Sequence, residues 1–252
     1  MYSNPSPCLP RSSFRLSLLI MILSLNGCSL FRGADFLKQW AHLKVSTDAK
    51  PKLTSLTVTH LGVTTLLFQD GKNAILTDGY FSRPGALKVL LDRKIRPNEK
   101  RIKHGLKLGG ITTLDAIFAL HSHFDHAMDV AVVAGLTNAT AYGSKSTINI
   151  AMGGGIPCEK MREFDLLKPV IIGDFEISVI ASDHFDVPFR QKKLLGTRID
   201  LPLLPPARVT DYAEGGSYSL HIKHPQGTFL VTGSAGFEKG ALEHYQANVA
   251  FL

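Results

Sequence analysis

Apolar and polar positions along the middle of the chain predict strands first and helices afterwards. Three runs of apolar and β-branched residues open the ordered part, at positions 53–60, 64–70 and 73–78. Asp70-Gly71 lies between the last two runs and is a hairpin signal. Helical spacing follows over 84–94, with a proline in its first turn. The domain is therefore expected to begin with strands, two of them joined as a hairpin.

The later segments again predict strands followed by helices. A short apolar run at 114–120 is typical of a buried strand, and the Ala- and Val-rich stretch 127–136 is typical of a helix. The elements expected after these are a strand and a helix over 140–152, two strands over 169–184, a hairpin about 225–227, a helix over 237–246 and a strand over 247–252. Strands in blocks, interrupted by helices, indicate two sheets packed between helix layers.

The first residues have the composition of a bacterial secretory signal. Arg11 and Arg15 precede an apolar run at 16–25, which is shorter than the roughly 20 residues that a transmembrane helix needs. The sequence LNGC, ending at Cys28, resembles a lipobox in which Cys28 is acylated. Plain secretion is the alternative, because Asn26 is unusual in such a motif.

These features give an expected domain organisation and location. We expect a signal peptide at 1–27, a lipid tether at 28–52 and one domain at 53–252. The protein is then exported to the cell envelope and lipid-anchored, and Ser29 after the cysteine favours the outer membrane, facing the periplasm. Cys8 leaves with the signal and Cys28 carries lipid, so Cys158 has no partner for a disulfide and stability must come from the core.

Positive charge is mild and is densest at 92–107. The chain has 28 Lys and Arg against 21 Asp and Glu, a formal net charge of +7, which falls to +5 without Arg11 and Arg15. A nucleic-acid face could be built on 92–107, but a solvated connector between two ordered segments fits it better. We therefore expect a membrane partner through the lipid anchor and no nucleic-acid partner.

A group of histidines and carboxylates follows the buried strand at 114–120. In the stretch ALHSHFDHAMD, the side chains His121, His123, Asp125 and His126 lie where a strand gives way to a helix. Residues i and i+2 of an extended segment point to the same side, so His121 and His123 can converge on one ion. Imidazole and carboxylate groups suit zinc. A metal site is the interpretation we follow, and a polar loop formed by chance is the alternative.

At this point the chain resembles the metallo-β-lactamase superfamily, whose signature is this His-x-His-x-Asp-His run after a strand. The resemblance covers about 53–252 and implies an α/β (α+β) fold, an αββα sandwich of two mixed β-sheets flanked by helices. It further implies that Asp78 orients the histidine loop and that His184, at the end of a later strand, completes a three-histidine zinc site with His121 and His123.

Two departures from the family pattern concern the second metal. Family members carry a bridging Asp where this chain has Ser234, and a serine there resembles one β-lactamase subclass. The family also supplies one more His beyond the strand that 247–252 resembles, and we expect the segment that would hold it to be missing. The second ion would then have Asp125 and His126, so one or two zinc ions are expected.

The resemblance implies a zinc-dependent hydrolase. A metal-bound hydroxide attacks the substrate, Asp125 orients this nucleophile, and Asp125 and His184 are the expected catalytic side chains. The apolar, proline-rich segment 185–216 favours a small-molecule or lipid-like substrate with a phosphodiester or an acyl ester or amide. The alternatives are a β-lactamase and, from another class, a non-catalytic envelope protein that retains the fold.

Overall fold

A computed structural model describes residues 55–184, 198–233, 236 and 240–252. All of them belong to one compact unit, residues 51–252. The expected signal peptide and tether, including Cys28, lie outside the described residues. Within the described residues, no helix is both long and apolar enough to cross a membrane.

The first sheet has six strands. They are β1 (Thr57–Gly62), β2 (Thr65–Gln69), β3 (Ala74–Thr77), β5 (Ala116–Phe118), β6 (Thr140–Gly143) and β7 (Met161–Glu163). They lie side by side in the order β1-β2-β3-β5-β6-β7. The first three strands are antiparallel, whereas β3, β5, β6 and β7 run parallel. The carboxyl ends of the four parallel strands therefore lie along one edge of this sheet, where α/β folds place their ligands.

The second sheet has five strands, from the later part of the chain. They are β8 (Val170–Ile172), β9 (Phe175–Ser182), β11 (Ser217–His224), β12 (Gly227–Val231) and β13 (Val249–Phe251), in the order β13-β12-β11-β9-β8. Neighbours are antiparallel except β12 and β13, which are parallel. A separate two-stranded sheet joins β4 (Lys94–Ile95) to β10 (Ala207–Arg208).

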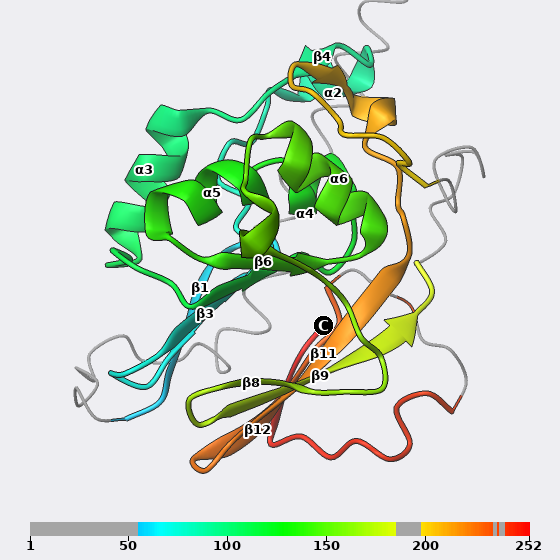
Figure 1. The fold of residues 1–252 in the computed structure, drawn as a ribbon. Helices are drawn as coiled ribbons and strands as arrows, with labels where there is room; N and C mark the ends of the chain where they lie inside the picture. The colour runs from blue at the N-terminus through cyan, green and yellow to red at the C-terminus, as the bar shows by residue number, and fades with distance from the viewer. Residues whose placement is uncertain (1–54, 185–197, 234–235, 237–239) are drawn as a thin grey trace, which may run out of the picture. The chain divides into compact units, whose positions relative to one another are not determined.

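Helices cover the first sheet on the face away from the second (Figure 1). The helices are α2 (Ala86–Leu90), α3 (Glu99–Leu108), α4 (Phe124–Ala127), α5 (Val130–Thr137) and α6 (Lys145–Gly153), with short 3-10 turns η2 (Cys158–Lys160) and η3 (Val209–Asp211). One apolar core lies between the helices and the first sheet, and a second lies between the two sheets, around Phe68, Phe118 and Phe175. The expected fold class, two mixed sheets packed face to face with helices outside, is confirmed.

Every described member of the two cores belongs to the unit 51–252. Their members run from Leu56 to Phe251, and the strands alternate so that Leu67 and Leu76 face the helices while Phe68 and Ile75 face the second sheet. A segment that contains its own hydrophobic core folds as a unit. Residues 51–252 therefore make a suitable fragment for experiments.

Three expected elements differ in the structure. The segment 92–107 is no solvated connector, because most of it forms α3, with Ile102 and Leu106 buried. The helix expected over 84–94 is only the five residues of α2, and Lys94 already belongs to β4. Residues 240–244, part of an expected helix, form turns.

Candidate metal centre

The histidine loop starts at the carboxyl end of β5, the middle of the first sheet. Backbone hydrogen bonds fix the two residues that lead into the loop. Ala119 N–H donates to Tyr142 O at 3.0 Å, and Tyr218 N–H donates to Leu120 O at 2.9 Å. The first bond is to β6 and the second is to the start of β11, so the loop is held to both sheets. His123 then ends the extended backbone and is the N-cap residue of α4, so the strand gives way to a helix within the histidine loop.

Three histidines from two sheets converge at this point. One nitrogen each from His121, His123 and His184 lies within 4.8 Å of the other two. The ring centroids are 4.9 Å apart for His121 and His123, 4.9 Å for His123 and His184, and 5.1 Å for His121 and His184. His184 comes just after β9, which lies between β11 and β8 in the second sheet. The group therefore spans the two sheets.

His121 is buried and electrically neutral. Burial lowers the pKa of His121 well below its ordinary value, and positive charge on His126, His123 or His184 would lower it further. Its Nδ1 atom is buried and has no hydrogen-bond partner among the described residues. A neutral ring keeps a lone pair, which is the form in which histidine binds a metal.

Asp125 and His126 form a second group, which shares His121 with the first. One ligand atom each from His121, Asp125 and His126 lies within 4.8 Å of the other two. The rings of His121 and His126 are 3.7 Å apart at their centroids, and His126 Nε2 lies 4.0 Å from Asp125 Oδ2. His126 is buried, whereas the Asp125 side chain is 41% exposed. Asp125 is thus the member of this group that solvent reaches.

Asp78 orients the ring of His126 through a contact with Nδ1. Its Oδ2 atom lies 2.7 Å from His126 Nδ1 and also accepts from the Thr64 hydroxyl, while its Oδ1 atom accepts from Leu120 N–H at 2.9 Å. A carboxylate on Nδ1 keeps the proton there and leaves Nε2 for a ligand. Burial opposes protonation of His126, but the charge and hydrogen bond of Asp78 outweigh it and raise the pKa.

Asp129 is a structural residue that the sequence interpretation missed. It is fully buried, and it accepts hydrogen bonds from Phe81 N–H at 2.8 Å, Ser82 N–H at 2.6 Å and the Ser82 hydroxyl at 2.6 Å. These bonds hold the segment after Asp78 against the start of α5. The usable signal was an aspartate inside the apolar run that continues the histidine loop.

The part of the expected substrate segment that the structure describes is anchored rather than loose. Ile199 N–H donates to Ser146 Oγ at 2.9 Å, and Leu203 N–H donates to Asn149 O at 3.0 Å, so α6 holds 199–203. Residues 185–197 and Ser234, the residue expected near the second ion, lie outside the described residues.

A third group of metal-type ligands lies elsewhere, at the turns that join neighbouring strands. It consists of Asp70, Asp174 and His224. His224 Nδ1 accepts a hydrogen bond from Gln226 N–H at 3.2 Å, so the proton of the neutral ring is on Nε2, which faces Asp70 Oδ2 at 3.4 Å. In this tautomer Nε2 directs its proton at a carboxylate, which suits an ion pair or hydrogen bond rather than a metal ligand.

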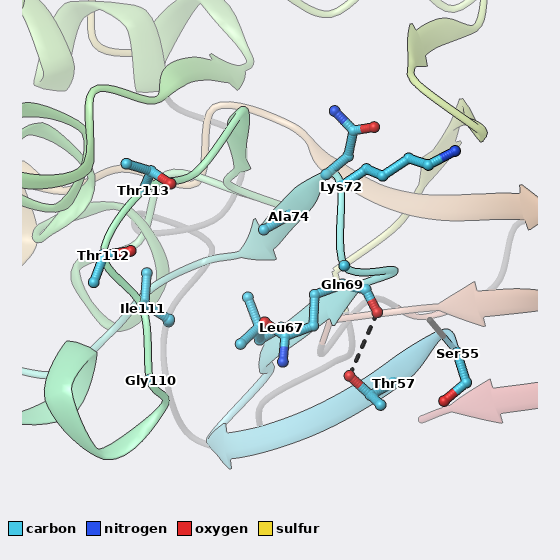
Figure 2. Close-up of a pocket in the computed structure, with 12 residues that line it drawn as sticks. Ser55, Thr57, Leu67, Gln69, Lys72, Ala74, Gly110, Ile111, Thr112 and Thr113 are labelled. Carbon is cyan, nitrogen blue, oxygen red and sulfur yellow. Dashed lines mark hydrogen bonds between the residues drawn. The ribbon is translucent and has the colours of Figure 1, made fainter. Parts of the chain in front are cut away.

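A hollow of about 310 Å³ beside the β2–β3 turn also lacks the chemistry of a metal centre (Figure 2). Its lining residues include Thr57, Gln69, Lys72, Thr112 and Thr113. Among the described residues the lining contains no His, Cys, Asp or Glu, so they offer neither a metal ligand nor a carboxylate base. The histidine loop remains the place where the described residues can hold a metal.

The residues at the histidine loop fit a zinc ion. Neutral imidazole and carboxylate are zinc ligands, and a catalytic zinc has three protein ligands and one open position. The group of His121, His123 and His184 meets that number, and the buried, unpaired Nδ1 of His121 shows that this ring is not committed elsewhere in the described part. The five ligand side chains are therefore grouped as a three-histidine set and an overlapping set that shares His121.

Comparisons with known proteins give the family. Residues 58–245 match the model of the metallo-beta-lactamase superfamily. No curated protein matches the chain. Similar solved structures include the metallo-beta-lactamase fold protein YhfI from Bacillus subtilis, with 16% identity over 67% of this chain and 53% of that chain and a TM-score of 0.38. The chain thus spans about half of that protein.

Two other solved structures are matched over more of their length. One is an isothiocyanate hydrolase from Delia radicum gut bacteria, with 14% identity over 77% of this chain and 69% of that chain and a TM-score of 0.49. The other is a possible metal-dependent hydrolase from Veillonella parvula, with 14% identity over 78% and 71% and a TM-score of 0.48. The family model covers most of the chain, and the chain belongs to the metallo-beta-lactamase superfamily.

Proposed function

We propose that the protein is a zinc-dependent hydrolase that cleaves a phosphodiester or an acyl ester or amide. The observation that carries this proposal is the convergence of His121, His123 and His184 from two different sheets. Three imidazoles within 4.8 Å of one another repel each other when protonated and gain stability by sharing a cation. Structural packing alone would not require them to meet there.

The chemistry divides between the metal and this chain's own residues. Zinc, when bound, lowers the pKa of water to about 7 and polarises a carbonyl or phosphoryl oxygen. Asp78 fixes the ring of His126 through Nδ1, so the opposite nitrogen faces Asp125. Asp125 is half-exposed and next to this group, so its carboxylate is placed to orient a water molecule and to accept its proton.

The proposed substrate is small or lipid-like, and the proposed place of action is the cell envelope. The support is the signal and lipobox pattern of 1–28 and the exposed Leu201 and Leu204 on the segment before β10. A lipid anchor would keep the site near membrane substrates. Outer-membrane placement facing the periplasm is part of the same proposal.

The experiment that tests the function combines metal content with turnover. The protein is analysed for zinc after dialysis, and is then assayed with bis-p-nitrophenyl phosphate, p-nitrophenyl acyl esters and nitrocefin. We expect about one or two zinc ions per chain and turnover of the phosphodiester or an ester. Turnover of nitrocefin alone would instead favour a β-lactamase, and protein without metal or turnover would favour a non-catalytic envelope protein.

A matched pair of variants assigns the turnover to the histidine loop. His123→Ala is expected to lose turnover and zinc together, because it removes one of three ligands. His244→Ala changes an exposed histidine outside the site and is expected to keep both. Near-normal turnover by His123→Ala would overturn the proposed mechanism.

A further inference from the structure

Helix α2 has an apolar face that is exposed to solvent instead of packed on a core. Leu87, Leu90 and Leu91 are spaced i, i+3 and i+4, which puts them on one helix face. Their exposed fractions are 67%, 74% and 51%, and none of the α2 residues is buried. An apolar face of this kind normally packs on a core, so its exposure indicates a surface that meets an apolar phase or a partner.

The segment 83–107, which includes α2 and the residues on either side of it, carries the net positive charge of the protein. Residues 83–107 contain nine Lys and Arg but two Asp and Glu. The rest of the chain has 19 of each and no net formal charge. The two acids are Asp92, which accepts from Thr210 N–H at 3.0 Å, and Glu99, which pairs with Lys103 at 2.5 Å, and they offset only part of the positive charge. The surface therefore keeps a concentrated positive charge.

Several of these cations line a single hollow beside α2. The hollow has a volume of about 790 Å³ and is lined by Arg83, Lys88, Lys94, Arg96 and Arg101, among others. Arg101 is held by Ser82 O at 2.8 Å and Arg83 O at 2.7 Å, which fixes one wall.

Lys88, Lys94 and Arg96 are exposed at the hollow. Helix α2 and strand β4 lie together at one end of the unit, at the top of Figure 1 and away from β12.

The segment before β10 adjoins the hollow and carries exposed leucines of its own. Pro206 lines the same hollow, and Ala207 pairs with Ile95 of β4. Leu201 and Leu204, on the same segment, are 77% and 71% exposed. The surface therefore combines exposed leucines with a basic hollow.

We propose that α2 and the adjoining basic hollow form a docking surface for anionic phospholipid membranes. Leu87, Leu90 and Leu91 enter the boundary between headgroups and acyl chains, and the cations of the hollow contact the phosphates. Exposed leucines on one helix face beside lysines and arginines are typical of interfacial membrane binding, in which apolar burial and attraction to anionic lipid act together. Nucleic acid would match the cations but would leave the leucines in water. This surface is distinct from the histidine loop and from Cys28, and it requires neither hydrolysis nor acylation.

The test measures binding of the fragment 51–252 to lipid vesicles by sedimentation. Two vesicle types are compared, phosphatidylcholine alone and phosphatidylcholine with about 30% phosphatidylglycerol. We expect binding to the anionic vesicles, weakening at about 0.5 M NaCl, where exposed charges are screened over a few ångströms. Absence of binding, or equal binding to both vesicle types, would overturn the proposal.

Matched pairs of variants assign the binding to this surface. Lys88→Gln with Lys94→Gln, and separately Leu87→Gln with Leu90→Gln, are each expected to weaken binding by about tenfold or more. The controls make the same changes at exposed residues elsewhere and are expected to leave binding unchanged. These controls are Lys72→Gln with Lys168→Gln and Leu166→Gln with Leu167→Gln.

Circular dichroism and thermal melting check that every pair remains folded. Equal loss in test and control pairs would contradict the assignment. So would binding to a DNA duplex that exceeds vesicle binding and is insensitive to the leucine changes, because that would make nucleic acid the partner.

Discussion

At Asp78, one buried carboxylate accepts hydrogen bonds from three separate parts of the chain. Thr64 comes from the turn between β1 and β2, Leu120 from the end of β5, and His126 from α4. The backbone of Asp78 has a φ of 53°, a left-handed conformation that Asp and Asn adopt more easily than other residues with a side chain. Both the left-handed backbone conformation and the hydrogen bonds therefore favour an aspartate at this position.

Asp78→Asn is expected to weaken metal binding without unfolding the protein. Asn tolerates the same backbone conformation, but it removes the negative charge that keeps the proton on His126 Nδ1. Loss of such a supporting carboxylate costs about 10- to 100-fold in metal affinity. Zinc affinity is measured by competition with a chelator. Asp165→Asn, at an exposed carboxylate, is the control, and equal affinity in the two variants would contradict this role of Asp78.

Asp129→Ala is expected to destabilise the fold by about 3 kcal/mol, because three buried donors lose their acceptor. Urea unfolding of the fragment 51–252 measures this change in the free energy of unfolding. Asp165→Ala removes an acceptor from one exposed donor, Leu167 N–H, and should change stability little. Similar midpoints for the two variants would show that the buried donors find other partners.

Helix α3 shows why charge density misleads when elements are predicted from sequence. Lys and Arg occupy so many of its positions that the segment is typical of a solvated connector. Its two buried residues, Ile102 and Leu106, are nevertheless spaced i, i+4, and the Asn98 side chain accepts from Arg101 N–H at the helix start. The strands were predictable because their apolar runs are nearly continuous, whereas α3 depends on two apolar side chains whose partners are distant in sequence.

The stability of Ile102→Ala distinguishes a packed helix from a solvated connector in this segment. The Ile102 side chain is fully buried in the core beneath the helices, so truncation should cost about 3 kcal/mol. Lys103→Ala, on the exposed side of α3, should change stability by about 0.5 kcal/mol or less. Chemical unfolding of both variants gives the comparison, and two equally small effects would restore the connector interpretation.

The β2–β3 turn is expected to contribute a pH-dependent part of the stability. Burial alone would raise the pKa of Asp70, but hydrogen bonds from Asn73 N–H and Lys72 N–H, together with His224, lower it below its ordinary value of 3.8. A carboxylate with a lowered pKa in the fold stabilises it above about pH 4, and this contribution is lost as pH falls through the folded pKa.

Asp70→Asn should therefore flatten the acid limb of the stability profile. The variant is less stable than the wild type at neutral pH, and the difference shrinks as the pH falls below about 4. Urea midpoints across this range measure the effect. Asp174, exposed beside the turn, gives the matched control through Asp174→Asn, which should leave the profile close to that of the wild type. A constant difference at every pH would mean that the charge of Asp70 is not involved.

For the whole molecule, the candidate metal centre joins two sheets that are made by different halves of the chain. His121 and His123 follow β5, and His184 follows β9. Sequence spacing and family resemblance could nominate these residues, because the signature run is local and His184 ends a recognisable strand. The overlap of the two groups at His121 and the support from Thr64 and Asp129 were not predictable in this way, because they depend on how the sheets and helices pack.

Because the three histidines come from both sheets, a bound ion should cross-link them and raise the melting temperature. Zinc at about 100 times its dissociation constant stabilises the folded state by about 2.7 kcal/mol. For a unit of this size, each kcal/mol corresponds to about 2–4 °C, so zinc should raise the melting temperature by about 5–10 °C. His184→Ala should abolish this rise, whatever its effect without zinc, and His244→Ala should keep it. Differential scanning calorimetry with zinc and with a chelator measures the difference, and an equal rise in both variants would mean that the ion is held by the first sheet alone.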